Sequence, residues 1–128
     1  PVHIGETGWA TYSNEQYGAS GSRATDEYKS GKYYQAIREW TTRERIACFY
    51  FEAFDEHWKD AQNPGGSENH FGLFTREGKA KYALWPLVDQ GVFNGLQRNG
   101  NPITKTYQGN LSTLMQEVKL PQIPEMQR

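Results

Sequence analysis

The chain has 128 residues, and its 14 Lys and Arg against 15 Asp and Glu give a formal net charge of −1. This length suits one domain with its own hydrophobic core and is too short for two. The balanced charge argues against a nucleic-acid partner, because proteins that bind nucleic acid usually carry a basic face. No segment reaches the roughly 18 apolar residues that a membrane-spanning helix needs, so we expect no membrane span.

Metal, disulfide and cofactor sites have little support in the sequence. Cys48 is the single cysteine, which excludes an internal disulfide framework and a four-cysteine zinc site. It lies in an apolar run, where we expect a buried and unreactive thiol. His3, His57 and His70 lack the spacing of metal ligands, and no phosphate-binding glycine loop occurs. We therefore expect no metal and no cofactor.

The first elements of the chain predict a short strand followed by a long polar loop. Residues 2–4 are apolar and lead into a glycine-punctuated turn that carries Glu6 at its tip. Residues 10–23 are polar and show no periodicity, which is typical of a functional or mobile loop. The first residues show no charged-then-apolar leader, so we expect no signal peptide within the chain.

A helix is predicted over residues 25–45. Thr25 can cap its start, and Asp26 and Glu27 place negative charge in its first turn, where the helix dipole favours it. Gly31 is expected to soften the helix locally. The apolar positions that recur at helical spacing are Tyr33, Ala36, Ile37 and Trp40. We interpret Arg43 and Arg45 as helix-terminal charges.

The next segment predicts a second strand and, with it, the fold class. Residues 46–51 are six consecutive apolar residues, typical of a strand that is buried on both faces. Strand, helix and strand in this order predict an α/β fold with parallel strands.

The second half of the chain is less regular. Residues 71–74 form a short apolar return between turns, and residues 79–93 have helical spacing that Pro86 interrupts, so we expect a broken or kinked helix there. Residues 94–128 are more polar, with a turn at 99–102, and are expected to form a surface extension.

Carboxylates follow both predicted strands, which is where α/β proteins bind their ligands. Glu6 follows the first strand, and three further acids follow the second: Glu52, Asp55 and Glu56. Carboxylates suit a glycosidic reaction centre, and flat rings suit sugar faces; the rings nearby are Trp9, Phe54 and Trp58. The alternative is that these positions are acidic simply because strand ends are exposed.

Three motifs resemble glycoside hydrolase family 17, the β-1,3-glucanases and related glucanosyltransferases. Residues 4–9 are similar to its E-T-G-W nucleophile motif, and residues 50–59 are similar to its F-E-A-F-D-E-x-W-K segment. Residues 70–74 resemble its H-F-G-L-F segment. The resemblance covers about residues 1–85, and it implies a secreted, periplasmic or cell-envelope protein.

The resemblance implies a TIM (β/α)8 barrel, with Glu6 as the nucleophile at the end of strand seven. The segment after strand eight would supply Glu56 and Lys59 as polar site residues, and Trp9 and Phe54 would line the glucan-binding cleft. The implied reaction is retaining cleavage of β-1,3-glucan, or transfer of the glycosyl group to another sugar, which needs a second carboxyl as acid/base.

Two departures from the family pattern shape the prediction. Ala10 replaces a proline that would stiffen the loop after Trp9. The family's general acid ends strand four, and no segment corresponds to strands one to six, although such a barrel needs about 250 residues. We therefore expect residues 1–93 to be the C-terminal portion of a catalytic domain, an incomplete barrel, with 94–128 as an extension.

The partner of this incomplete barrel would be the missing N-terminal barrel segment or further copies of the chain. The alternative is a non-catalytic glucan-binding or structural remnant that assembles with another chain.

Overall fold

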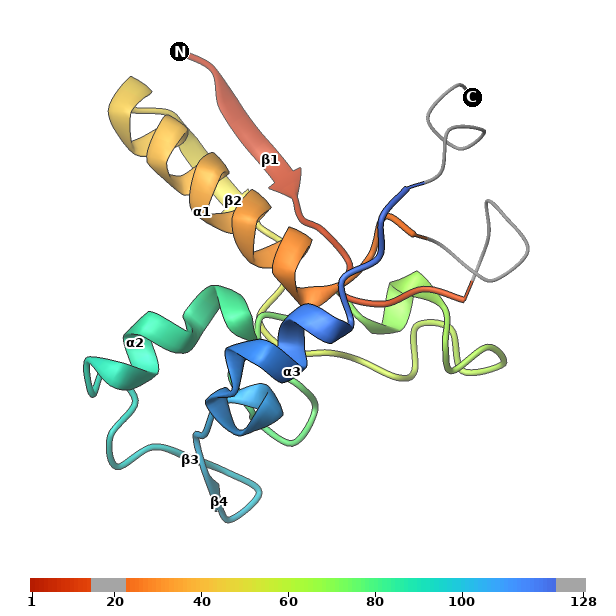
Figure 1. Ribbon diagram of the computed structural model, residues 1–128. Coiled ribbons are helices and arrows are strands. Elements are labelled where there is room, and N and C mark those ends of the chain that lie inside the picture. Colours follow the sequence, from red (N-terminus) through yellow and green to blue (C-terminus); the bar gives the residue numbers. More distant parts are fainter. Residues whose placement is uncertain (15–22, 122–128) are drawn as a thin grey trace.

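The computed structural model describes residues 1–14 and 23–121 (Figure 1). Most of the polar loop expected at 10–23 therefore lies outside the described residues. The first three elements are β1 (His3–Thr7), α1 (Glu27–Glu44) and β2 (Ala47–Tyr50). They are followed by the 3-10 helices η1 (Ser67–Asn69) and η2 (Tyr82–Leu84), α2 (Trp85–Asp89), β3 (Gln97–Arg98), β4 (Asn101–Pro102), η3 (Thr106–Gly109) and α3 (Leu111–Gln116).

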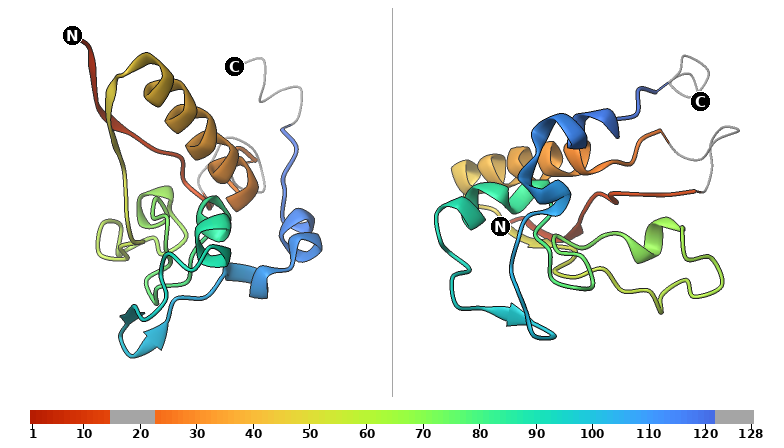
Figure 2. Two further views of the ribbon diagram at one scale, coloured as in Figure 1. Left: turned by 90° about the vertical axis from the view of Figure 1, so that its left-hand side faces the viewer. Right: turned by 60° about the horizontal axis from the view of Figure 1, so that its bottom comes forward.

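The β1–α1–β2 unit confirms the predicted α/β pattern. β1 and β2 pair in parallel, with His3 opposite Ala47 and Thr7 opposite Tyr50. α1 lies along one face of this pair, as Figures 1 and 2 show from three directions. The described residues hold one further sheet, the antiparallel β3–β4 hairpin, and they do not close a barrel.

β1 is longer than the sequence predicted, and Glu6 lies within it rather than in a turn. Pairing with β2 continues to the strand end, where the Phe51 amide donates to the Thr7 carbonyl at 2.7 Å. The register shifts between Ile4 and Thr7, which is typical of a β-bulge. A bulge of this kind re-aims the side chains beside it, and here it falls next to Glu6.

α1 begins at Glu27, two residues after the predicted start at residue 25, and Asp26 rather than Thr25 caps it. The Asp26 Oδ1 accepts a hydrogen bond from the Lys29 amide at 2.8 Å, and Glu27 occupies the first turn. The helix ends at Glu44 and is capped by Arg45, which has a left-handed backbone with a φ of 56°. The Arg45 amide donates to the carbonyls of Thr41 and Thr42 and so closes the last turn.

The packing face of α1 also differs from the predicted one. Trp40 and Ala36 are exposed, and the buried positions are the small residues Ser30, Gly31 and Thr41. A Cβ on Gly31 would lie 2.7 Å from the Tyr82 ring and 3.2 Å from the Ala83 nitrogen. Gly31 therefore lets α1 approach η2 closely.

The prediction that β2 is buried on both faces is wrong for the described chain. The Tyr50 ring packs against Tyr33 and Tyr34 of α1, but Phe49 on the same strand is 67% exposed. Cys48 lies on the same face as Tyr50, toward α1, and is half-buried rather than buried. The opposite face, which carries Phe49, has no described helix over it.

The expected break near Pro86 is present: the helical region is divided into the 3-10 helix η2 and the short α2. Pro86 lies in the first turn of α2, where the missing amide hydrogen costs nothing, and it follows directly on η2. Beyond it, residues 94–121 are folded against the rest of the chain: α3 contacts α1, and Leu114 is buried. The Thr106 amide donates to the Ala80 carbonyl at 2.9 Å, so this C-terminal part contributes to the core.

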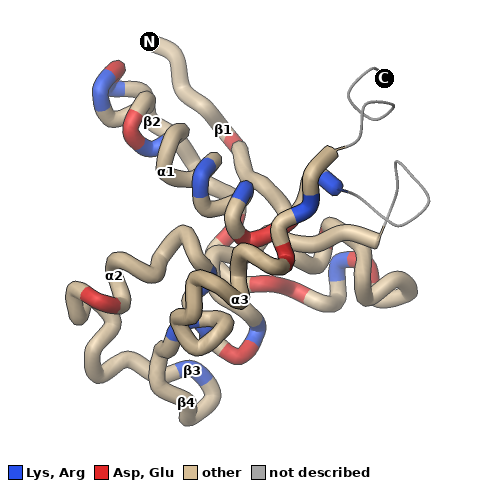
Figure 3. The backbone as a smooth tube through the Cα atoms, viewed as in Figure 1, with Lys and Arg blue, Asp and Glu red and all other residues tan. Residues whose placement is uncertain are grey.

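Acidic and basic positions are interspersed along the described chain (Figure 3). Within the described ranges, no helix combines the length and apolar character needed to cross a membrane.

Candidate active site

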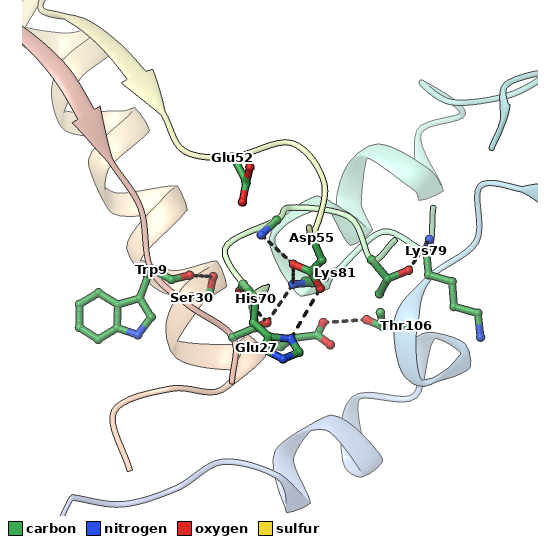
Figure 4. A network of polar contacts seen from close by, with 12 residues as sticks. Trp9, Glu27, Ser30, Glu52, Asp55, His70, Lys79, Lys81 and Thr106 are labelled. Carbon is green, nitrogen blue, oxygen red and sulfur yellow. Dashed lines mark hydrogen bonds and ion pairs between the residues drawn. The ribbon is translucent and has the colours of Figure 1, made fainter. Parts of the chain in front are cut away.

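The carboxyl ends of β1 and β2 meet at one edge, so Glu6 and Glu52 lie on adjoining segments. Gly8 makes this approach possible, because a Cβ there would lie 2.1 Å from the Phe51 carbonyl oxygen. A cis peptide bond joins Phe51 to Glu52, and Figure 4 shows the Glu52 side chain just beyond the end of β2. The two strand ends that carry these carboxylates therefore adjoin, as the predicted parallel pairing requires.

Glu6 is an exposed carboxylate on a strand end that is anchored on both sides. The Thr7 hydroxyl shares a hydrogen bond with the Tyr33 hydroxyl of α1. The Ser30 hydroxyl, also from α1, donates to the Trp9 carbonyl at 3.0 Å. These bonds hold the backbone on the C-terminal side of Glu6, while its own side chain is exposed.

A charged cluster follows β2, and we call Phe51, Glu52, Glu56 and Lys59 the Lys59 cluster. The Lys59 Nζ lies 3.2 and 3.3 Å from the two oxygens of Glu52 and 3.2 Å from Glu56 Oε2. It also lies 3.8 Å from the centroid of the Phe51 ring. The structure thus brings the predicted pair Glu56 and Lys59 together and adds Glu52, to which the family resemblance assigned no role.

Burial and the neighbouring charges set the protonation of this cluster. Burial raises the pKa of Glu52, Lys59 opposes this, and a hydrogen bond with Glu56 raises it further. Burial alone would lower the pKa of Lys59, but its bonds to Glu52 and Glu56 leave that pKa above its ordinary value. Lys59 is therefore a cation at neutral pH.

The two predicted cleft rings already have partners within the chain. The Trp9 indole donates to the Ala24 carbonyl at 2.8 Å and packs on Tyr33 at 5.4 Å between ring centroids. Figure 4 shows that the Trp9 ring turns away from Glu52 and Asp55. The role of Trp9 in lining the cleft remains a prediction.

Phe54 is likewise engaged. Its ring stacks on Phe74 at 5.1 Å, and the Arg98 guanidinium lies 3.7 Å from its centroid. Trp58 is different: it is 66% exposed, and its ring lies 5.9 Å from the Lys59 Nζ. Trp58 is the open ring beside the Lys59 cluster.

Asp55 does not join the Lys59 cluster. Its Oδ1 accepts from the Lys81 ammonium at 2.7 Å and from the Gly72 amide at 2.8 Å, and His70 Nδ1 lies 3.9 Å from its other oxygen (Figure 4). Lys81 also donates to the Thr11 hydroxyl at 2.8 Å. Asp55 is thus an internal anchor that ties together the segments following β1 and β2.

A second part-buried carboxylate, Glu27, holds the C-terminal part in place. Its Oε1 accepts from the Thr106 hydroxyl at 2.7 Å and from the Tyr82 amide at 2.9 Å. Burial raises its pKa, against the effect of these hydrogen bonds and of the nearby Lys81. Neither Lys81 nor Thr106 stands in a motif that could have marked it in the sequence.

In the part of the chain that the structure describes, no three His, Cys, Asp or Glu side chains are arranged to hold a metal ion.

Comparison with known proteins gives a consistent picture. The family model of glycosyl hydrolases family 17 matches residues 1–85. A glucan 1,3-beta-glucosidase of Arthroderma benhamiae is 38% identical over 88 residues, which are 63% of this chain and 27% of that protein. A glucan 1,3-beta-glucosidase of Saccharomyces cerevisiae is 34% identical over 84 residues, 63% of this chain and 25% of that protein.

A solved structure is similar over a longer range. The crystal structure of an endo-laminarinase from Formosa Hel1_33_131 superposes with a TM-score of 0.90 at 69% identity, covering 94% of this chain and 31% of that one. This coverage exceeds what residues 1–93 alone could supply, so the likeness continues into the C-terminal part. The chain spans about a quarter of the length of the curated relatives.

Proposed function

The chain belongs to glycosyl hydrolases family 17, and from this premise we propose that it supplies the nucleophile of a site that cleaves β-1,3-glucosidic bonds with retention, or transfers the glycosyl group. The observation that carries the proposal is the exposed Glu6 carboxylate at the carboxyl end of β1, on a strand end that adjoins the Lys59 cluster. The sequence resemblance predicted this role for Glu6.

The chemistry follows from the two-carboxylate scheme of retaining glycosidases. Glu6 attacks the anomeric carbon and displaces the leaving sugar, giving a covalent glycosyl-enzyme. Water or a sugar hydroxyl then releases the glycosyl group. A second carboxyl, about 5–5.5 Å from the nucleophile, protonates the leaving oxygen and later activates the incoming hydroxyl. We assign this second carboxyl to a part of the complete protein outside this chain. Glu56 and Lys59 would bind sugar hydroxyls.

Family membership and the solved relative imply a TIM-barrel enzyme. We propose that β1 and β2 are strands seven and eight of the barrel, and that residues 1–93 are the C-terminal portion of its catalytic domain, followed by 94–128. The single covered face of the β1–β2 pair and the exposure of Phe49 support this placement. The outer edges of the β1–β2 pair would pair with the N-terminal barrel segment or with another copy of the chain, because unpaired strand edges seek partners.

A second candidate is a non-catalytic glucan-binding remnant that assembles with another chain. The exposed Trp58 ring beside charged hydrogen-bonding groups favours it, since such rings stack on sugar faces. Under this candidate, laminari-oligosaccharides bind at equilibrium and no product is released.

The deciding experiment is turnover of laminarin by the complete protein and by its Glu6→Gln variant. We expect the variant to lose at least about a thousandfold in kcat while its melting temperature is unchanged, because the carboxylate is exposed and only the nucleophile is removed. Glu77→Gln, an exposed carboxylate in a turn, is the matched control and should keep full activity. Retained turnover in Glu6→Gln would contradict the proposal. Binding without turnover in the unaltered protein would favour the second candidate.

A further inference from the structure

We propose that Glu52 is a positioning residue of the glucan site: it holds the ammonium of Lys59 and so leaves Glu56 free to accept a hydrogen bond from a sugar hydroxyl. The inference rests on the proposed function and adds a residue to which the family resemblance assigned no role. Its basis is the asymmetric geometry of the Lys59 cluster.

The two carboxylates hold Lys59 differently. Both oxygens of Glu52 lie within 3.3 Å of the Lys59 Nζ, whereas the closest approach of Glu56 is the 3.2 Å contact of its Oε2. The Glu52 side chain is 12% exposed and that of Lys59 is 17% exposed, against 37% for Glu56. Glu52 is therefore the covered member that fixes the cation, and Glu56 is the member that a ligand can reach.

The backbone of Glu52 is itself fixed. Its amide donates to the Phe71 carbonyl at 3.0 Å, and its carbonyl accepts from the Leu73 amide at 2.9 Å. The Phe51 ring covers the ammonium from another side, at 3.8 Å. Lys59 is thus held by a carboxylate on a rigid segment and by a ring, with Glu56 between the cation and solvent.

The charges explain why Glu52 matters for Glu56. The two carboxylates and the ammonium sum to −1, so one negative charge is left over for a ligand. The charge of Glu52 also reaches Lys81, on the segment after Phe74, where it opposes the lowering of the Lys81 pKa by burial. If Glu52 were neutral, the Lys59 ammonium would pair with Glu56 alone and compete with the sugar hydroxyl for its oxygens.

The test is a double-mutant cycle in the complete protein on laminari-oligosaccharides, with Glu52→Gln, Lys59→Met and both together. We expect Glu52→Gln to raise KM about tenfold, the size of one charge-assisted hydrogen bond, with kcat within about threefold. Because Glu52 acts through Lys59, the double variant should be no worse than Lys59→Met alone. Glu77→Gln should behave as the unaltered protein.

The Glu52→Asp variant distinguishes the effect of the charge from the effect of the side-chain position. It also replaces Glu52→Gln in the test if that variant fails to fold. It keeps the negative charge but shortens the side chain by one carbon, so KM should rise while the acid limb of the pH–activity profile stays in place. With Glu52→Gln the acid limb should move, since one titrating carboxyl is removed. If Glu52 only stabilised the fold, its substitution would lower the melting temperature and leave the acid limb unchanged.

The outcomes are distinct. The complete protein could be active while Glu52→Gln and Glu52→Asp leave KM unchanged, or while the losses of Glu52→Gln and Lys59→Met add. Either result would contradict the role proposed for Glu52 and leave the proposed function standing. A complete protein without laminarin turnover contradicts the proposed function and, with it, this role.

Discussion

The Asp55 carboxylate and the Lys81 ammonium lie 2.7 Å apart in the interior of the protein, joining the segment after β2 to the start of η2. Burial lowers the pKa of Lys81, and the charge of Asp55 opposes that shift. Asp55 belongs to the same segment, residues 51–59, that carries the Lys59 cluster, so its pairing with Lys81 anchors that segment. The site therefore rests on a buried ion pair.

Removing one partner of this pair should be costly. We expect Lys81→Met to lower the free energy of unfolding by roughly 3–5 kcal/mol, because it leaves Asp55 buried without its cation. Chemical denaturation of the complete protein measures this. Lys79→Met, two residues away and exposed, is the matched control and should stay within about 0.5 kcal/mol. Equal effects of the two substitutions would show that the ion pair contributes nothing.

Substitution by alanine should destabilise the protein at one of the two glycines near Glu6 and leave it unchanged at the other. A Cβ on Gly8 would collide with the Phe51 carbonyl, whereas Gly5 has no atom within 4 Å of the same position. Gly8→Ala should lower the free energy of unfolding by about 1–3 kcal/mol and also reduce kcat, because the ends of β1 and β2 must separate. Gly5→Ala should leave stability nearly unchanged. Thermal unfolding and laminarin turnover of both variants check the pair of expectations.

The pH dependence of stability should carry the signature of Glu27. Its pKa is raised in the folded protein, mainly by burial, so the folded state binds this proton more tightly than the unfolded state does. Glu27 therefore contributes stability at low pH, and that contribution is lost as the pH rises from the ordinary pKa of a glutamate, about 4.3, through the raised one.

Glu27→Gln removes this titration while its amide oxygen can still accept from the Thr106 hydroxyl and the Tyr82 amide. We expect its unfolding midpoint in urea to vary less with pH across that window than that of the unaltered protein. Glu39→Gln, an exposed position on α1, should leave the pH dependence as it is. An unchanged slope in Glu27→Gln would contradict the assignment.

The exposed Trp58 ring offers a test of sugar binding that is separate from folding. Trp58→Ala should raise KM for laminarin about tenfold, since stacking on one ring is worth about 1–2 kcal/mol, and should leave the melting temperature unchanged. Trp40→Ala, which removes another exposed indole from α1, should not alter KM. The kinetics of these two variants show whether the effect belongs to the position or to any exposed ring.

Local signals predicted the parts of this fold that local forces determine. The periodicity over 25–45 gave α1, and the strand–helix–strand order gave the parallel pair. The choice of cap was beyond sequence reasoning, because Thr25 and Asp26 can both cap a helix. Asp26 prevails in the structure, since its carboxylate also accepts from the Lys119 amide at 3.1 Å.

The features that the sequence analysis predicted wrongly or missed depend on contacts between segments that are distant in the chain. An apolar run such as 46–51 predicts burial but does not say which surface covers it, and here α1 covers one face. Likewise, the motif around Glu56 and Lys59 was visible in the sequence, whereas the pairing of Asp55 with Lys81 depends on a contact 26 positions apart. Polar partners of this kind follow from the fold and not from spacing.

The bond between Asp26 and the Lys119 amide spans 93 positions, and it has a consequence for synthesis. α1, which anchors the strand end beside Glu6, gains this bond at its capped start only when the last described residues have left the ribosome. Arg23 reaches the same stretch through the Leu120 carbonyl at 3.2 Å. A nascent chain that stops at residue 93 would contain all three family motifs and still lack these two hydrogen bonds, which Asp26 and Arg23 make at and just before the start of α1.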